Sequence, residues 1–166
     1  MTVQEFIEAY DRAPQKDQFL KRHIKTDYVS YFLKIAECHK VVEFSMYKEV
    51  DGRKVFWKDS PSLFQLFICR LLAHYTDVDL GNDSANGFDE LNKVGLINAI
   101  IDQIPESEYK EWNTLLQMIA DDEMENVRSF AGYLDTKIDG INMLMKATAE
   151  DEELQKKIVE FTNQEG

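Results

Sequence analysis

The chain has 166 residues, of which 44% are hydrophobic, and a formal net charge of −12 at neutral pH. A chain of this size and composition can bury one hydrophobic core, so we predict a single helical domain over residues 1–166. No apolar run approaches the roughly 18 residues that span a membrane. The first residues, MTVQEFIEAY, lack the basic and apolar regions of a signal peptide. These features favour an intracellular protein with no membrane partner.

The negative charge is concentrated in the second part of the chain. Residues 1–100 contain 13 Lys/Arg and 15 Asp/Glu, a net charge of −2, whereas residues 101–166 contain 6 and 16, a net charge of −10. An acidic surface repels phosphate groups, which argues against direct binding of nucleic acid. It favours either simple solubility or a basic protein partner, and both interpretations stay open.

Capping and periodicity predict helices through the first 44 residues. Thr2 and Glu5 have the spacing of a capping box, which predicts a helix over residues 3–13, and a second short helix follows over residues 16–24. The segment 28–44, with Phe32 among its apolar residues, is apolar on more than one face. That pattern is typical of a central helix in a bundle.

The region 46–57 predicts a small β-hairpin. Asp51-Gly52 lies between the β-prone runs MYKEV and KVFW, which is a strong hairpin signal. Two strands alone are only marginally stable, so the hairpin must pack on helices. Ser60-Pro61, an N-cap followed by proline, then starts the most hydrophobic helix, over residues 60–75. Short helices are predicted over residues 87–93 and 96–104.

The segment 105–146 predicts a long amphipathic helix. Its stripe positions span 33 residues in nine steps, about 3.67 residues per step, which is close to the helical period. Gly132 and the acidic cluster at 121–125 are the candidate breaks, so the segment is one helix or two. The stripe forms a bundle core, a surface for another copy of the chain, or both. Its members are Trp112, Leu116, Ile119, Glu123, Val127, Phe130, Leu134, Ile138, Ile141 and Met145.

These elements predict an all-α fold, a bundle of about six helices with one hairpin. Residues 147–166 are expected to form a loosely attached acidic helix. The candidate protein-binding residues fall into three groups: hairpin aromatic residues, acids of the cluster, and stripe residues. They are Tyr47, Phe56 and Trp57; Asp121, Asp122, Glu123 and Glu125; and Phe130 and Leu134.

No catalytic, metal or cofactor signature is present. The acidic loop 76–87 breaks the order of an EF-hand, because Gly81 and Phe88 occupy ligand positions, and it is interpreted as a turn-forming loop. Cys38 and Cys69 lie in apolar helical stretches without metal-ligand spacing and predict buried free thiols. We therefore expect neither an enzyme nor a bound cofactor.

Four stretches together resemble small acidic helical proteins encoded among the virion-assembly genes of tailed bacteriophages of Gram-positive bacteria. They are the hairpin sequence through Trp57, the apolar helix that ends in Tyr75-Thr76-Asp77, the stretch FDELN with GLI, and the start of the long helix at Ile104-Pro105-Glu106. The resemblance covers roughly residues 26–145. It implies a non-enzymatic tail-assembly chaperone or head-to-tail adaptor, located in the host cytoplasm or the virion, that binds other protein subunits.

One alternative function comes from the charge alone. An acidic protein can mimic nucleic acid and block a nucleic-acid-binding protein of the host or of a defence system. Such a mimic needs carboxylates in two ordered rows at about the spacing of phosphates, and not merely a high total of acids.

Overall fold

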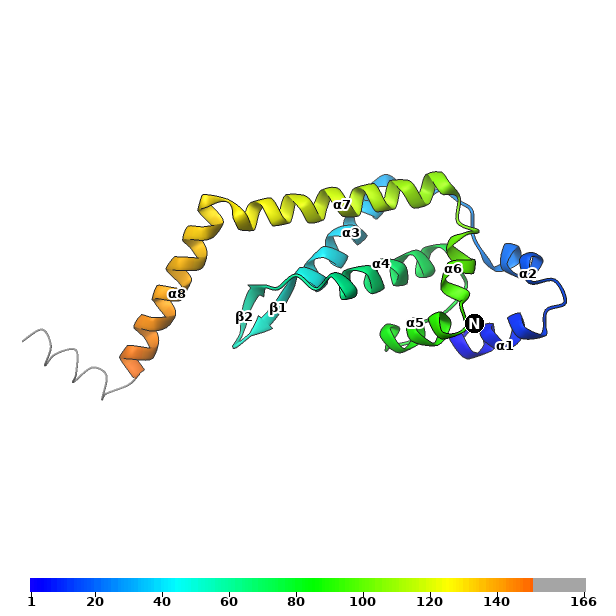
Figure 1. Cartoon of the computed structure of the whole chain (residues 1–166), viewed down its shortest axis with the longest axis horizontal. Helices are drawn as coiled ribbons and strands as arrows, with labels where there is room; N and C mark the ends of the chain where they lie inside the picture. The colour runs from blue at the N-terminus through cyan, green and yellow to red at the C-terminus, as the bar shows by residue number, and fades with distance from the viewer. Residues whose placement is uncertain (151–166) are drawn as a thin grey trace, which may run out of the picture. The chain divides into compact units, whose positions relative to one another are not determined.

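The computed structural model describes the backbone of residues 1–150, and the side-chain environments of these residues except 130, 131, 136, 144 and 147–150. Within this range the chain forms eight helices and one two-stranded hairpin, which confirms the all-α class with a hairpin (Figure 1). The helices outnumber the six or so predicted for the bundle, and one of the additional helices arises because the segment 105–146 forms two helices. The elements are α1 (Val3–Arg12), α2 (Lys16–His23), α3 (Tyr31–Met46), β1 (Tyr47–Val50), β2 (Arg53–Phe56), α4 (Ser60–Tyr75), α5 (Ser84–Lys93), α6 (Leu96–Ile101), α7 (Glu106–Arg128) and α8 (Phe130–Glu150).

The chain divides into two compact units, Met1–Asp121 and a second unit that begins at Asp122. The boundary therefore falls within α7. The single domain predicted over residues 1–166 stays a prediction. The acidic helix predicted over 147–166 lies mostly outside the described residues, and 147–150 form the last turn of α8.

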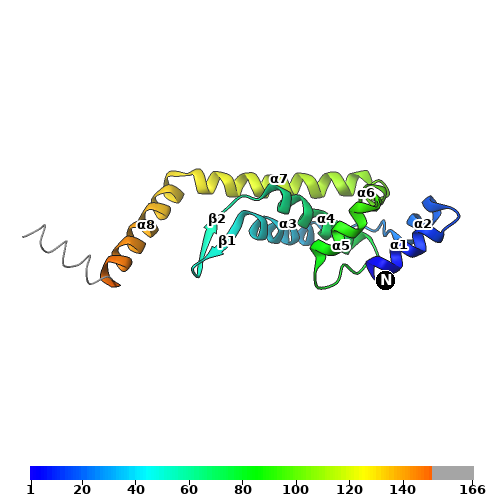
Figure 2. The ribbon, with the colours of Figure 1, turned by 60° about the horizontal axis from the view of Figure 1, so that its bottom comes forward.

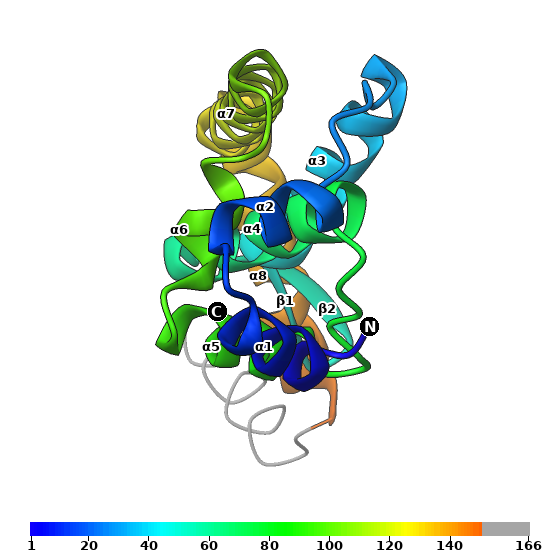
Figure 3. The same ribbon diagram turned by 90° about the vertical axis from the view of Figure 1, so that its right-hand side faces the viewer.

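In the first unit, α1 packs against α2 and α5 (Figure 3). The predicted capping box is present: the Thr2 hydroxyl accepts the Glu5 N–H at 3.3 Å, and the Glu5 carboxylate accepts the Thr2 N–H at 2.8 Å. Phe6 is fully buried, and its ring centroid lies 5.3 Å from that of Phe19 in α2. The two N-terminal helices are thus held together by aromatic packing.

The core of the first unit lies between α3 and α4, with the first part of α7 alongside them (Figure 2). Ile68 and Leu71 of α4 and Met46 of α3 are fully buried there. The predicted N-cap of α4, Ser60, is wrong by one residue. Asp59 caps the helix instead, because its carboxylate accepts the Ser62 N–H at 3.1 Å.

The segment 28–44 contributes to the core, but its helix differs from the prediction in where it starts and in which of its faces is buried. Its helix, α3, begins only at Tyr31, and Phe32 is 83% exposed. The buried face of α3 runs instead through Lys34, Cys38 and Val41. Apolar composition did not distinguish a helix buried on several faces from one with exposed aromatic residues at its start.

The predicted hairpin is confirmed, with Tyr47 paired to Phe56 and Val50 to Arg53. Asp51 and Gly52 have φ angles of 52° and 73°, the positive values that a tight two-residue hairpin turn requires. The pairing continues past the strands, since the Trp57 N–H donates to the Met46 carbonyl at 2.8 Å. The hairpin therefore extends directly from the end of α3.

Within the second unit, the helix predicted over 105–146 is broken at Ser129, three residues before the predicted break at Gly132. The Ser129 N–H still donates to the Glu125 carbonyl at 2.8 Å, and its hydroxyl accepts the Gly132 N–H at 3.2 Å. Ser129 thus closes α7 and caps the start of α8. A Cβ at position 132 would lie 2.4 Å from the Asn126 carbonyl oxygen, so the joint requires glycine there.

Replacement of Gly132 by alanine should disrupt this joint. The added methyl group would clash with backbone, and alanine also favours a continuous helix by about 1 kcal/mol. Spin labels at positions 125 and 139 should therefore move apart, toward the roughly 21 Å that 14 residues span in a straight helix. Gly140→Ala is the matched control, because a Cβ at position 140 meets no atom within 4 Å and should leave the distance unchanged. An unaltered distance in Gly132→Ala would contradict the steric account of the joint.

Candidate functional site

A buried ion cluster connects α3, α4 and α7 in the first unit. The Lys34 side chain is completely buried, and its ammonium nitrogen lies 2.9 Å from a Glu108 carboxylate oxygen while also pairing with Glu111. The Tyr75 hydroxyl donates to the same Glu108 carboxylate, and the Trp112 indole N–H donates to the Tyr75 oxygen at 3.0 Å. These groups contact one another, which is the arrangement of a structural cluster.

The cluster keeps its acid and its base charged. Burial raises the pKa of the Glu108 carboxyl, but hydrogen bonds from Tyr75 and Lys34 outweigh burial and bring the pKa below its ordinary value. Burial lowers the pKa of Lys34, but its bonds to the two glutamates outweigh burial and raise that pKa above its ordinary value. Sequence reasoning missed this cluster, because Lys34 lies in an apolar helix and Glu108 resembled an ordinary acid at a helix start.

A second ion cluster lies where α3 meets α4. The Glu37 carboxylate pairs with Lys40 at 2.8 Å and with Arg70 of α4 at 3.4 Å. Burial lowers the pKa of the neighbouring His74, whose ring centroid lies 5.6 Å from that of Trp112. The carboxylate is thus engaged by two cations, and the histidine is packed on an aromatic ring. These contacts stabilise the helix pair.

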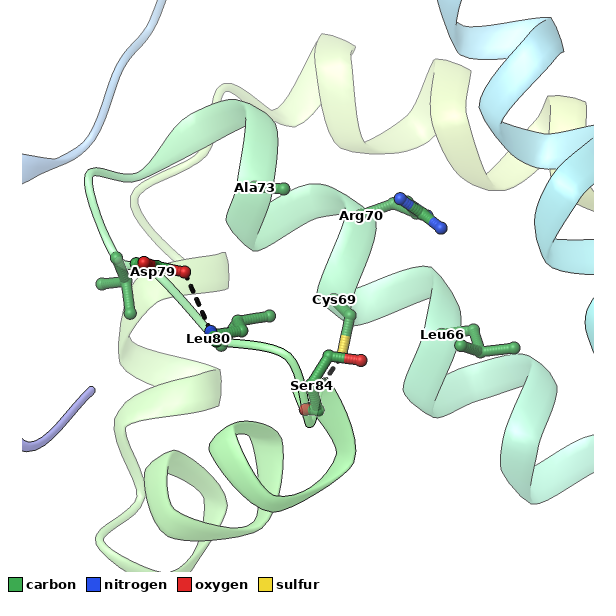
Figure 4. Close-up of a pocket in the computed structure, with 9 residues that line it drawn as sticks. Leu66, Cys69, Arg70, Ala73, Asp79, Leu80 and Ser84 are labelled. Carbon is green, nitrogen blue, oxygen red and sulfur yellow. Dashed lines mark hydrogen bonds between the residues drawn. The ribbon is translucent and has the colours of Figure 1, made fainter. Parts of the chain in front are cut away.

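A pocket of about 300 Å³ lies between α4 and the loop that follows it (Figure 4). The Cys69 thiol donates to the Ser84 carbonyl at 3.7 Å, and burial raises the pKa of this thiol, which opposes thiolate chemistry. Asp79 accepts the Gly81 N–H at 2.9 Å. These polar groups of the pocket thus form hydrogen bonds with other residues of the chain. Both cysteines are buried free thiols, as predicted.

The acidic loop uses its carboxylates in turns, caps and ion pairs. Asp77 pairs with Lys25 at 3.2 Å, and Asp83 caps α5 by accepting the Asn86 N–H at 3.2 Å. In the described part of the chain, no group of three or more His, Cys, Asp or Glu side chains has the placement to hold a metal ion. Among the same residues, no helix is both long and apolar enough to cross a bilayer.

The structure separates the three aromatic residues predicted for the hairpin. Tyr47 and Phe56 are half-buried partners with ring centroids 5.6 Å apart. Trp57 is 57% exposed, and the Lys48 ammonium nitrogen lies 3.5 Å from its ring centroid. Because neighbouring strand residues point to opposite faces, Trp57 lies on the face opposite Tyr47 and Phe56. Of the three, Trp57 is the residue most accessible to a partner.

The amphipathic stripe of α7 and α8 changes its exposure along the chain. Trp112 is fully buried and Leu116 is 5% exposed, while Ile119 and Val127 are intermediate. In α8, the residues we call the distal stripe are exposed by 39–65% of their surface. The distal stripe consists of Leu134, Ile138, Ile141 and Met145. The side chain of Phe130, which was predicted to bind protein, lies outside the described set.

The acidic cluster lies on α7 near the boundary of the units. Asp121, Asp122 and Glu125 are exposed, and Glu123 is intermediate. These neighbouring positions on one helix point in several directions around its axis. They therefore do not by themselves form the two ordered rows of carboxylates that a mimic of nucleic acid needs.

Comparisons of the chain with protein families, with curated proteins and with solved structures found no match.

Glu108 should make the stability of the first unit depend on pH. Because folding lowers its pKa, the stabilisation is present above the unfolded pKa and is lost as the pH falls through the lower folded pKa. Glu108→Gln should lower the free energy of unfolding at pH 7 by about 3 kcal/mol, the lower end for a broken buried pair, because Lys34 keeps Glu111. The difference from the unmodified chain should shrink in more acidic solution.

Denaturant unfolding at a series of pH values measures this effect. Glu111→Gln serves as the control: its side chain is 34% exposed and bonds the same lysine, so its loss should be smaller. Equal stability of Glu108→Gln and the unmodified chain at pH 7 would show that the cluster does not stabilise the fold.

Proposed function

We propose that the chain is a non-enzymatic assembly protein that binds other protein subunits through the distal stripe of α8. One observation carries this proposal. The same stripe that is buried at Trp112 and Leu116 is exposed from Leu134 to Met145. One apolar pattern is thus buried in the core at its start and, within the described residues, exposed at its end.

The size of the distal stripe fits a partner helix. At roughly 100 Å² for each half-exposed large side chain, the four stripe residues offer about 400 Å². A partner that buries an equal area gives roughly 800 Å² in total, which is the size of a weak or transient interface. Most of the stability of a helix in a protein comes from packing of its amphipathic face, so a partner on the distal stripe would also stabilise α8 itself.

The geometry of the other clusters favours binding over catalysis. The ions of the first unit pair with one another, and the polar groups of the pocket beside α4 are bonded to their own chain. The resemblance to virion-assembly proteins supplies the class of partner, namely other subunits of a particle, with a second copy of the chain as one candidate. The corresponding architecture is a helical protein in which α8 provides the binding surface.

The distal stripe should be required for association. Ile138→Asp with Ile141→Asp places two charges in the stripe and should abolish binding, because apolar burial drives it. Met143→Asp is the matched control. Met143 is exposed on the same helix but lies about half a turn away from the stripe. Its replacement should leave binding intact.

Sedimentation of the purified chain, alone and with an extract of its natural host, measures this association at low and high salt. Contacts made by the stripe should persist in high salt, whereas contacts made by the acidic cluster should weaken. A chain that stays monomeric and binds nothing, or that loses binding equally in both variants, would contradict the proposal.

A further inference from the structure

One face of the hairpin combines apolar and basic side chains, of which Arg53 is partly buried and the others are exposed. Strand alternation and the observed register place Lys48, Val50, Arg53 and Val55 on one face, and Trp57 follows in the same alternation. Val50, Val55 and Trp57 are 39%, 40% and 57% exposed. These five residues are called the hairpin face below. They belong to the first unit, and none of them is a residue of the distal stripe.

The charges of the hairpin face lack acidic partners within the described residues. Neither Lys48 nor Arg53 forms an ion pair there, and Lys48 instead lies over the Trp57 ring. On the opposite face, Lys54 pairs with Glu43 at 2.6 Å, and this hydrogen bond lowers the pKa of the Glu43 carboxyl. The two faces therefore differ. Lys54 on one face is paired with a carboxylate of the chain, whereas Lys48 and Arg53 on the hairpin face form no ion pair within the described residues.

We propose that the hairpin face binds an amphipathic helix of another protein, one whose apolar stripe is flanked by carboxylates. A helix laid on one face of a sheet is a standard way to bury that face. The valines and Trp57 accept the apolar stripe. Lys48 and Arg53 pair with the flanking carboxylates, and the planar guanidinium group of Arg53 suits a bidentate contact. The apolar area and the charge of the hairpin face thus specify a single kind of occupant.

A single-stranded nucleic acid fits the hairpin face less well. Stacking of successive bases needs several free aromatic rings, whereas this face offers one ring, already covered on one side by Lys48. Residues 1–121 contain 14 Lys/Arg and 20 Asp/Glu, so the surrounding unit is acidic and repels a phosphate chain. A helix with a few carboxylates needs only the two local cations.

Binding of synthetic probes to the full-length chain tests this proposal. The first probe is a fluorescent peptide of about 14 residues, roughly four helical turns, with leucine along one stripe and glutamate beside it. A second peptide has lysine in place of glutamate, and a thymidine oligonucleotide is the third probe. Fluorescence anisotropy should show that the glutamate peptide binds. It should also show that the lysine peptide binds more weakly and that the oligonucleotide binds no more tightly than the glutamate peptide.

Charge reversal at the hairpin face provides the decisive comparison. Lys48→Glu with Arg53→Glu should weaken binding of the glutamate peptide by about tenfold or more. Lys21→Glu with Lys93→Glu is the matched control. Both lysines are exposed on helices away from the hairpin, in α2 and α5, and this variant changes the net charge by the same amount as the hairpin variant. Trp57→Ser should also weaken binding without any change of charge, which keeps the test valid if the reversed variant does not fold.

Three results would overturn the proposal. They are no binding of the glutamate peptide to the unmodified chain, equal weakening by the control variant, and tighter binding of either of the other probes. The variant Ile138→Asp with Ile141→Asp should bind the glutamate peptide normally. Failure of the hairpin face and failure of the distal stripe are therefore distinguishable.

Discussion

Lys34 carries its charge where water does not reach it, and Glu108 and Glu111 of α7 supply the opposite charges. An unpaired ammonium group in this position would cost several kcal/mol, so the position of α7 along α3 is tied to this lysine. Tyr75 brings α4 into the same cluster through its bond to Glu108. Three helices that are distant in sequence thus share one set of hydrogen bonds, and the buried apolar residues pack around it.

The position of α7 gives the amphipathic stripe two different environments. Near Glu108 the stripe is covered, and Trp112 both fills the core and donates to Tyr75. Beyond the joint at Ser129 the same pattern continues, and the described part of the chain leaves its residues from Leu134 to Met145 exposed. Gly132 permits that joint, because its missing Cβ leaves room for the Asn126 carbonyl. A continuous sequence pattern therefore belongs to two helices, and in the proposed function only the first serves the chain's own core.

Local signals in the sequence were sufficient for several elements. The capping box at Thr2 and the turn at Asp51-Gly52 each depend on neighbouring residues, and the structure contains both. The burial of Lys34 could not be predicted, because its partners lie more than 70 residues away in the chain. The exposure of Phe32 was missed for a related reason. Composition shows that a helix is apolar, but only its tertiary neighbours determine which of its faces is covered.

The candidate site was predictable only in part. The stripe residues of α8 and the hairpin aromatic residues were recognised from periodicity and turn chemistry. The division of the hairpin into a packed face and an open face depends on the strand register and on the ion pair between Lys54 and Glu43. No local pattern reveals which of several hairpin lysines has a carboxylate beside it in the folded chain.

The central claim is that the distal stripe, which the described part of the chain leaves exposed, is covered when a partner binds. Hydrogen–deuterium exchange of the dilute chain tests this claim most directly, because amide protection reports how readily each helix opens. The account predicts strong protection around Trp112 in α7 and rapid exchange from Leu134 to Met145 in α8, with slower exchange there once a partner binds. Equal protection of the two segments in the dilute monomer would contradict it.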